Sequence, residues 1–238
     1  QAGILYVSPE QLRNSTFKKA IALREIGAWV FDEAHCLSKW GHDFRPDYLY
    51  AARFVREFSE RQGTQAAPIV CVTATAKPEV RDEILAHFRA ELGQELEVFD
   101  GHAARENLTL RVENVAGHDK VPRLRELVAE QLTVSPTGSV LIYTATRSNA
   151  EKAATLLRGA GIEAEAFHAG LDIPTKKAVQ ESFLRGESRV VCATNAFGMG
   201  IDKPDIRLVV HFEIPGSLEA YVQEVGRAGR DGNPAEAV

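Results

Sequence analysis

The segment VFDEAHCLSKWGHDFRP (Val30–Pro46) decides the fold, because an apolar run that starts at Ala28 ends there in two carboxylates, Asp32 and Glu33. This pattern is typical of a buried strand that ends at the surface, and the carboxyl ends of parallel strands form the edge where open α/β sheets bind ligands. An aspartate at that edge can hold Mg²⁺ through a water molecule. The adjacent glutamate can orient or deprotonate a water that attacks a phosphate. The pattern alone leaves open that the acids are helix caps.

Aromatic and basic side chains follow the carboxylates in a polar loop, namely Trp40, His42, Phe44 and Arg45. Exposed aromatic rings can stack on nucleic-acid bases without sequence preference, which contributes about 1–3 kcal/mol per base. An arginine beside them can contact phosphate and stack as well. The alternative interpretation is that Trp40 and Phe44 fill the core under the loop and that His35 is a structural histidine.

The composition is that of a globular protein, with 238 residues, 45% hydrophobic and 26% charged, enough for one large or two ordinary domains. No apolar stretch approaches the roughly 20 residues of a membrane span, and no signal-peptide pattern opens the chain. Three cysteines stand far apart without a CxxC pair, which disfavours a disulfide framework or zinc site and fits a reducing cytoplasm. The formal net charge of -5 means that any nucleic-acid site must be a local patch.

Continuous apolar runs alternate with helical patterns along the rest of the chain. Strands are predicted at residues 3–7, 28–31, 68–73, 139–143, 164–168, 189–193 and 208–212. Helices are predicted from the SPEQL stretch, with Ser8 as cap, and at residues 47–60, 77–92, 121–132, 148–159, 175–184 and 217–225. The predicted strands are continuous apolar runs, without alternating polar residues, and helices separate them. This pattern predicts parallel sheets that are covered on both faces. A polar interval near residues 103–120 divides the pattern into two α/β units.

The longer string VFDEAHCLSKWGHDFRPDY closely resembles the RecQ family of DNA helicases, and DEAH is a signature of superfamily 2 helicases. In that family the loop after DEAH is rich in aromatic residues, senses single-stranded DNA and couples it to ATP hydrolysis. The resemblance therefore implies that Trp40, His42, Phe44 and Arg45 bind DNA. ILYVSPEQL resembles motif Ib, which implies a DNA-backbone contact by Ser8 and Glu10. VTATA (Val72–Ala76) resembles motif III, which links the ATP state to the grip on DNA.

Three further stretches of the second unit resemble the same family in the same order. IYTATRSNAEKAATLL resembles motif IV and implies that Thr144 and Arg147 face a DNA phosphate. ATNAFGMGIDKPDIRLVVHFEIP resembles motif V and places Thr194 near the DNA backbone, with Asp202 near the nucleotide or the arginines of the last motif. Glycines in this motif, including Gly200, permit close backbone approach.

YVQEVGRAGRDG resembles motif VI and contains Gln223, Arg227 and Arg230. The two arginines are spaced about one turn apart on an expected helix, and such arginines can stabilise charge on a transferring γ-phosphate. A salt-bridged surface arginine is the alternative for either one.

The resemblance implies an α/β fold of two RecA-like parallel-sheet units, the first truncated at its N-terminus. The expected domains are residues 1–105 with motifs Ib, II, the aromatic-rich loop and III, a linker at 106–118, and residues 119–238 with motifs IV, V and VI. The implied activity is that of an ATP-dependent 3′-to-5′ DNA helicase in repair and recombination. ATP and Mg²⁺ are the implied cofactors, and single-stranded or duplex-junction DNA is the partner, with no membrane. The implied location is cytoplasmic and nucleoid-associated in a bacterium, or nuclear in a eukaryote.

The resemblance also assigns roles to residues. The implied catalytic residues are Asp32, Glu33, His35, Gln223, Arg227 and Arg230. The implied nucleotide-binding residues are Asp32, Gly200, Asp202, Arg227 and Arg230, and Asp32 is the implied Mg²⁺ ligand, through water.

No GxxxxGK[ST] phosphate-binding loop occurs in the sequence. In the family this loop precedes motif Ib, so we expect it upstream of Gln1. The zinc module and winged-helix domain that are common in the family are not found in this sequence. The 238-residue chain alone is therefore expected neither to bind ATP tightly nor to hydrolyse it. One alternative is a non-catalytic nucleic-acid-binding module derived from a helicase. A DEAD/DEAH-type RNA helicase is another, which the aromatic loop and the GRAGR spelling disfavour.

Overall fold

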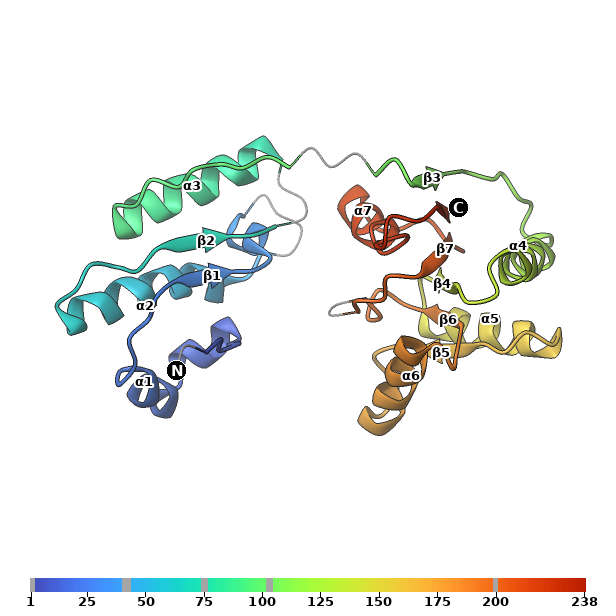
Figure 1. The fold of residues 1–238 in the computed structure, drawn as a ribbon, viewed down its shortest axis with the longest axis horizontal. Helices are drawn as coiled ribbons and strands as arrows, with labels where there is room; N and C mark the ends of the chain where they lie inside the picture. Colours follow the sequence, from blue (N-terminus) through green and yellow to red (C-terminus); the bar gives the residue numbers. More distant parts are fainter. Residues whose placement is uncertain (1–2, 40–43, 74–76, 102–104, 199–200) are drawn as a thin grey trace. The chain divides into compact units, whose positions relative to one another are not determined.

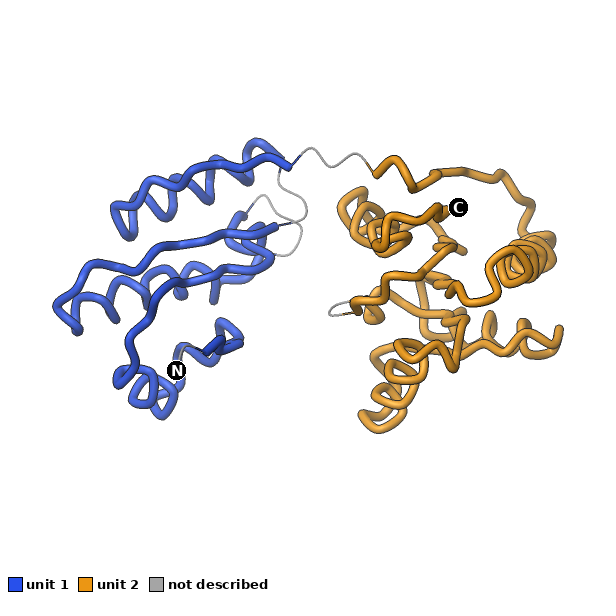
Figure 2. The backbone as a smooth tube through the Cα atoms, viewed as in Figure 1, with its two compact units in different colours: residues 1–101 blue, residues 102–238 orange. Residues whose placement is uncertain are grey.

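Two compact units make up the protein in a computed structural model that describes residues 3–39, 44–73, 77–101, 105–198 and 201–238. Unit 1 comprises Gln1–Gly101 and unit 2 comprises His102–Val238 (Figure 2). Each unit has its own hydrophobic core, so each is described separately. Among the described residues, no helix combines the length and apolarity that crossing a membrane requires.

Unit 1 packs its helices against a small sheet (Figure 1). Its helices are α1 (Ser15–Ile21), α2 (Pro46–Gln62) and α3 (Pro78–Leu92), with the short 3₁₀ helices η1 (Pro9–Arg13) and η2 (Ala34–Leu37). Strands β1 (Trp29–Phe31) and β2 (Ile69–Cys71) pair in parallel. Proline stands in the first turn of both α2 and α3, where its missing N–H costs no hydrogen bond, and a left-handed glycine follows each helix.

The sheet of unit 1 is buried on one face. Phe31 and Ile69 belong to a core that α2 and α3 share, while Val30, Val70 and Val72 are 65%, 46% and 49% exposed. The prediction of a sheet covered on both faces is therefore wrong for the described part of unit 1. A continuous apolar run does not reveal which of its two faces is covered, because neighbouring side chains point to opposite sides.

The predicted strand at residues 3–7 is also wrong, because this segment has no regular structure and pairs with no described strand. Apolar residues form a strand only beside a partner, since isolated backbone N–H and C=O groups gain nothing from being extended. The SPEQL helix is the 3₁₀ helix η1, and Ser8 makes no side-chain capping bond there. Helix α1 begins instead at the cap of Asn14, whose side chain accepts from the N–H groups of Thr16 and Phe17.

Unit 2 is a six-stranded parallel sheet in the order β3-β8-β7-β4-β6-β5. Its strands are β3 (Leu108–Leu110), β4 (Ser139–Tyr143), β5 (Glu165–Phe167), β6 (Val190–Ala193), β7 (Ile206–His211) and β8 (Ala235–Ala237). Its helices are α4 (Lys120–Val134), α5 (Arg147–Gly159), α6 (Ile173–Arg185) and α7 (Leu218–Val225). Every residue of the central strand β4 is buried, as expected for a parallel sheet with helices on both faces.

Two apolar clusters cover the two faces of this sheet. Helices α4 and α5 pack on the face that contains Val140 and Ile142 of β4. Helices α6 and α7 pack on the other face, which contains Leu141 and Tyr143. The alternation along β4 explains why its sequence is apolar at every position from Val140 to Tyr143.

Two predictions about unit 2 need correction. The predicted linker at 106–118 contains β3, which pairs in parallel with β8 and so belongs to the sheet. Its sequence, LTL, is too short to be recognised without its partner, and β8 (AEA) gives no strand pattern at all. In addition, Arg227 and Arg230 do not lie on a helix, because α7 ends at Val225 and a run of turns follows.

Candidate active site

The two carboxylates lie directly after β1, at the carboxyl end of the sheet of unit 1. Both side chains are exposed. Glu33 adopts a left-handed conformation, with φ 51° and ψ 44°, and it is the one non-glycine residue with positive φ in the described part of the chain. Such a conformation costs on the order of 1–3 kcal/mol and persists only where its surroundings impose it. The Asp32 carboxylate stabilises the turn by accepting from the Glu33 N–H at 2.9 Å.

His35 joins the carboxylate turn to the neighbouring strand. It is only 4% exposed, and its Nδ1 lies 3.2 Å from Glu33 Oε2 and 3.0 Å from Thr73 Oγ1. Thr73 follows β2, so the histidine connects residues at the ends of both strands. The sequence left open whether His35 is structural or catalytic. In the structure His35 is a buried residue that contacts the Glu33 carboxylate.

Tyr48 also supports the turn, and the sequence analysis missed it. Its hydroxyl donates to the Asp32 carbonyl at 2.9 Å, and burial raises the pKa of this phenol. The hydroxyl therefore remains a donor at neutral pH. Tyr48 stands two residues after Pro46 on α2, where its aromatic ring suggested only packing.

The aromatic loop is described in part. Phe44 is half-buried, and Arg45 is exposed at the N-cap position of α2, with its N–H donating to the Cys36 carbonyl at 2.8 Å. Trp40 and His42 lie outside the described residues. Arg45 is therefore the described member of this group whose side chain is available to a phosphate.

Ser8 and Glu10 are both exposed around η1. A hydrogen bond from its own backbone N–H, together with one from the Ser8 hydroxyl, holds the pKa of the Glu10 carboxyl below its usual range. Glu10 is therefore ionised at neutral pH, so of the two residues only the Ser8 hydroxyl can contact a phosphate without charge repulsion.

Three predicted DNA contacts of unit 2 lie after the strands, on the carboxyl edge of the sheet or beside it. Thr144 and Thr194 are buried, at 6% and 9% exposure, and the Thr144 hydroxyl lies within 3.2 Å of the Thr146 carbonyl and 3.3 Å of the Ala193 carbonyl. Arg147, the first residue of α5, is exposed. Arg147 is thus exposed to solvent, whereas the two threonines make internal contacts.

Glu213 is a second residue that the sequence analysis missed. Its carboxylate accepts from the Ala145 N–H at 2.8 Å and from the Asn149 side chain. These donors lie at the N-terminus of α5, where the helix dipole favours negative charge. Glu213 therefore occupies a position next to Arg147 that suits an anion.

The two motif VI arginines are held by motif V. Arg227 donates to the Gly198 carbonyl, and a Cβ at position 198 would lie 2.6 Å from Arg227 Nη2, so only glycine leaves room for the guanidinium. Arg230 pairs with Asp202 at 2.9 Å. The sequence offered two neighbours for Asp202, the nucleotide or the motif VI arginines, and in the structure it contacts an arginine. Gln223 is half-buried on α7, and Gly200 lies outside the described residues.

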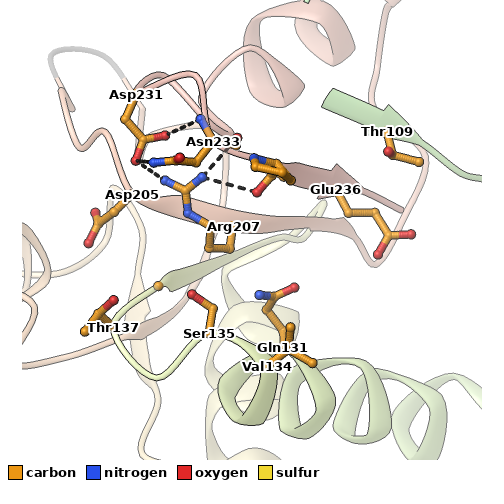
Figure 3. Close-up of a pocket in the computed structure, with 13 residues that line it drawn as sticks. Thr109, Gln131, Val134, Ser135, Thr137, Asp205, Arg207, Asp231, Asn233 and Glu236 are labelled. Atoms are coloured by element: carbon orange, nitrogen blue, oxygen red, sulfur yellow. Dashed lines mark hydrogen bonds and ion pairs between the residues drawn. The ribbon is translucent and has the colours of Figure 1, made fainter. Parts of the chain in front are cut away.

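An open groove lies at the opposite edge of the same sheet, away from these residues. It encloses about 630 Å³ and is lined by residues that precede β4, β7 and β8, among them Gly138, Asp205 and Pro234. Figure 3 shows the Arg207 guanidinium there between Asp231 and the backbone near Asn233. Since parallel strands bind ligands at their carboxyl ends, this groove is not the candidate active site.

The carboxylate turn fits a magnesium ion. Mg²⁺ takes oxygen ligands, keeps several waters and needs only one or two carboxylates from a protein. Asp32 is exposed and uses Oδ1 within the turn. Within the described ranges no group of three or more His, Cys, Asp or Glu side chains could hold a metal ion.

Comparison with solved structures agrees with the fold. The chain is similar to Dbp5 of S. cerevisiae bound to RNA and ADP BeF3, with a TM-score of 0.70 and 23% identity over 97% of this chain and 57% of that one. It is also similar to the helicase Lhr of Mycobacterium smegmatis bound to ssDNA and AMP-PNP, with a TM-score of 0.71 and 23% identity over 97% of this chain and 30% of that one. At this identity the likeness establishes the RecA-like fold and nothing further.

Comparison with protein families and curated sequences is more specific. The DEAD/DEAH box helicase model matches residues 1–84, and the helicase conserved C-terminal domain matches residues 119–232. ATP-dependent DNA helicase RecQ of Haemophilus influenzae is 38% identical over 100% of this chain, and RecQ of Pasteurella multocida is 41% identical over 99%. The probable ATP-dependent DNA helicase RecS of Bacillus subtilis is 37% identical over 98%.

The chain spans 36% of the length of the Haemophilus relative, 35% of the Pasteurella relative and 45% of RecS. Because relatives with 37–41% identity match 98–100% of the chain and so cover both units, the chain belongs to the RecQ family of helicases.

Proposed function

We propose that the protein containing this chain is an ATP-dependent DNA helicase that translocates 3′ to 5′. The observation that carries the proposal is the turn at Glu33, which is held in a left-handed conformation while its carboxylate contacts His35. A glutamate that has a strained backbone, is contacted by a buried histidine and is exposed at a sheet edge is suited to position a water for attack on a γ-phosphate.

The roles of the charged residues follow from their chemistry. Asp32 holds Mg²⁺ through water, and the ion when bound neutralises charge on the phosphate oxygens. Glu33 orients or deprotonates the attacking water. Arg227 and Arg230 stabilise the charge that spreads over the γ-phosphate oxygens in the transition state. Gln223 lies on α7, before the turn that carries the two arginines, and is assigned to the same step.

DNA binding is proposed for residues outside the carboxylate turn. Arg45 and Arg147 are exposed guanidinium groups that can contact phosphates. Phe44, with Trp40 and His42 of the same loop, supplies rings for base stacking. Ser8, Thr144 and Thr194 are assigned to the DNA backbone. Both threonines are buried, and the Thr144 hydroxyl contacts two carbonyls, so this role requires small movements that expose them.

The test is DNA-stimulated ATP hydrolysis by the complete protein. Glu33→Gln is expected to lower kcat by about 10²–10⁴-fold, because it removes the general base and keeps the shape of the side chain. ATP binding is expected to persist. Glu25→Gln, an exposed carboxylate of unit 1, serves as the matched control and should leave kcat unchanged.

Unchanged hydrolysis in Glu33→Gln would contradict the assignment. A wild-type protein without hydrolysis would favour the alternative of a non-catalytic nucleic-acid-binding module. Competition between single-stranded DNA and RNA of equal length separates a DNA from an RNA helicase. A comparison of forked with single-stranded DNA tests whether a duplex junction is preferred.

A further inference from the structure

A short segment at the start of unit 2 contacts the turn that carries the motif VI arginines. We propose that Arg105 and Asn107 are positioning residues that hold the turn Gly226–Arg230, so that Arg227 and Arg230 face the nucleotide. This inference rests on the proposed role of the two arginines in ATP hydrolysis. It assigns a function to residues that the sequence alone placed in or beside a linker.

Arg105 binds the turn through three carbonyl groups. Its Nη2 donates to the carbonyls of Ala228 and Gly229, both at 2.7 Å, and its Nη1 lies 3.4 Å from the Gly226 carbonyl. These carbonyls flank Arg227 on both sides. They follow the end of α7, where backbone carbonyls lack partners within the helix and a guanidinium is a favourable cap.

Asn107 makes a second attachment to the same turn. Its Nδ2 donates to the carbonyls of Gly229 and Asn233, both at 2.8 Å, while its Oδ1 accepts from Arg105 Nε at 3.4 Å. The two side chains therefore act as one unit. Both donors of the amide face carbonyl oxygens, and this fixes which way the amide must point.

Gly229 shows that the approach is close. It has φ +57°, and a Cβ there would lie 2.6 Å from Asn107 Nδ2 and 2.8 Å from the Asn233 carbonyl oxygen. A side chain at position 229 would push Asn107 away. The glycine thus serves the contact with Asn107 as well as the turn.

Arg105 lies close to the boundary between the two units in the sequence. The junction between the two units lies at Gly101 and His102, and Arg105 follows it closely. The turn with the two arginines is therefore bound to a residue near the start of unit 2, far from motif VI in the sequence. Loss of Arg105 would release the three carbonyls that flank Arg227.

The test compares two conservative variants in the complete protein. Asn107→Asp keeps the shape of the side chain but replaces the amide NH₂ group, which donates two hydrogen bonds, with a carboxylate oxygen. That oxygen cannot donate to the two carbonyl oxygens that it faces, and it repels them. It is expected to lower kcat for ATP by about 10–100-fold, the range expected from a small misplacement of catalytic groups. KM for ATP and the affinity for DNA should change less than twofold. Arg105→Lys, which cannot span three carbonyls, should give a smaller loss of kcat.

Arg111→Gln is the matched control. Arg111 lies just after β3 and pairs with Glu113 and Glu236, and in the described part of the chain its side chain forms no hydrogen bond or ion pair with the turn. It should retain the wild-type kcat. If Arg105→Lys and Asn107→Asp both keep the wild-type kcat while Arg227→Ala loses it, the positioning role is refuted and the proposed function stands.

A structural readout separates the two ideas further. In NMR spectra of the chain, the side-chain Nε–Hε signals of Arg227 and Arg230 should shift in Arg105→Lys and Asn107→Asp but not in Arg111→Gln. Unchanged signals would refute the contact. If Arg227→Ala itself retains hydrolysis, the proposed function of the arginines fails, and a shift of the remaining arginine signals still supports the contact.

Discussion

At the scale of single residues, the carboxylate turn joins two short motifs through one histidine. His35 contacts Glu33 from the first motif and Thr73 from the second. His35 and Thr73 are 38 positions apart in the sequence, and the sequence patterns assigned the two motifs separate roles. His35 thus links Glu33 to a hydroxyl group that follows the neighbouring strand, and we expect the orientation of Glu33 to depend on that hydroxyl.

Thr73→Val tests this dependence, because valine keeps the shape and removes the hydroxyl. The loss of one hydrogen bond to the residue that orients Glu33 is expected to lower kcat for ATP hydrolysis by about 5–30-fold, equivalent to about 1–2 kcal/mol. The measurement is steady-state hydrolysis by the complete protein. Thr64→Val, in an exposed loop of the same unit, should have no effect on kcat. Equal rates in the two variants would contradict the orienting role.

The Arg207–Asp231 pair is a second residue-scale feature with a measurable consequence. Arg207 is 8% exposed and donates to Asp231 and to three backbone carbonyls, and this contact holds the pKa of the Asp231 carboxyl well below its usual range (Figure 3). The folded state thus favours the ionised carboxyl. Its contribution to stability is fully present above the ordinary aspartate pKa of about 4 and is lost as the pH falls below it.

Asp231→Asn should therefore destabilise the protein by about 1.5–3 kcal/mol at pH 7, the usual value of a hydrogen bond to a charged group. The difference between variant and wild type should shrink as the pH is lowered from about 5 towards 2. Urea unfolding of unit 2, followed at several pH values, measures both effects. A difference that stays constant over this range would show that ionisation of Asp231 is not the cause.

At the scale of elements, the two sheets differ in how well they are covered. The central strands β4, β6 and β7 of unit 2 contribute residues to both apolar clusters and so lie between helices on both faces. The two strands of unit 1 are three residues long and leave Val30 and Val70 exposed, and the apolar segment at residues 3–7 pairs with nothing described. A two-stranded sheet is only marginally stable, and it depends on the helices that pack against it.

Limited proteolysis of the 238-residue chain should therefore cleave the segment before residue 105 first. The reason is that unit 1 opens at a lower free energy when fewer apolar contacts hold it. Cleavage sites are read by mass spectrometry at short digestion times. Early cleavage confined to residues 105–238 would contradict the predicted order of stability.

Element boundaries also show where sequence patterns succeed. Strand β4 has the predicted bounds because the apolar run from Val140 to Tyr143 stands between Gly138–Ser139 and the polar residues that follow. Strands β3 (LTL) and β8 (AEA) were missed because neither contains a continuous apolar run, and each is a strand only through pairing with its neighbours. The same pairing explains why the expected linker begins inside the second unit.

At the scale of the whole molecule, the chain holds carboxylates in one unit and arginines in the other but has no GxxxxGK[ST] loop. Such a loop supplies most of the contacts to the β- and γ-phosphates in proteins of this kind. The purified 238-residue chain should accordingly show no DNA-stimulated ATP hydrolysis above background. A phosphate-release assay measures this, and turnover that Glu33→Gln abolishes would contradict the prediction.

The sequence by itself determined the class of fold, the family and the identity of the charged groups. These depend on local features that survive without a structure: apolar runs, the DEAH string and the order of motifs. Tertiary structure decided which groups meet. The contacts of His35 with Thr73, Arg227 with Gly198 and Arg105 with Gly229 join residues 29 to 124 positions apart. Sequence spacing cannot give such contacts, because the packing of strand ends and turns in space creates them.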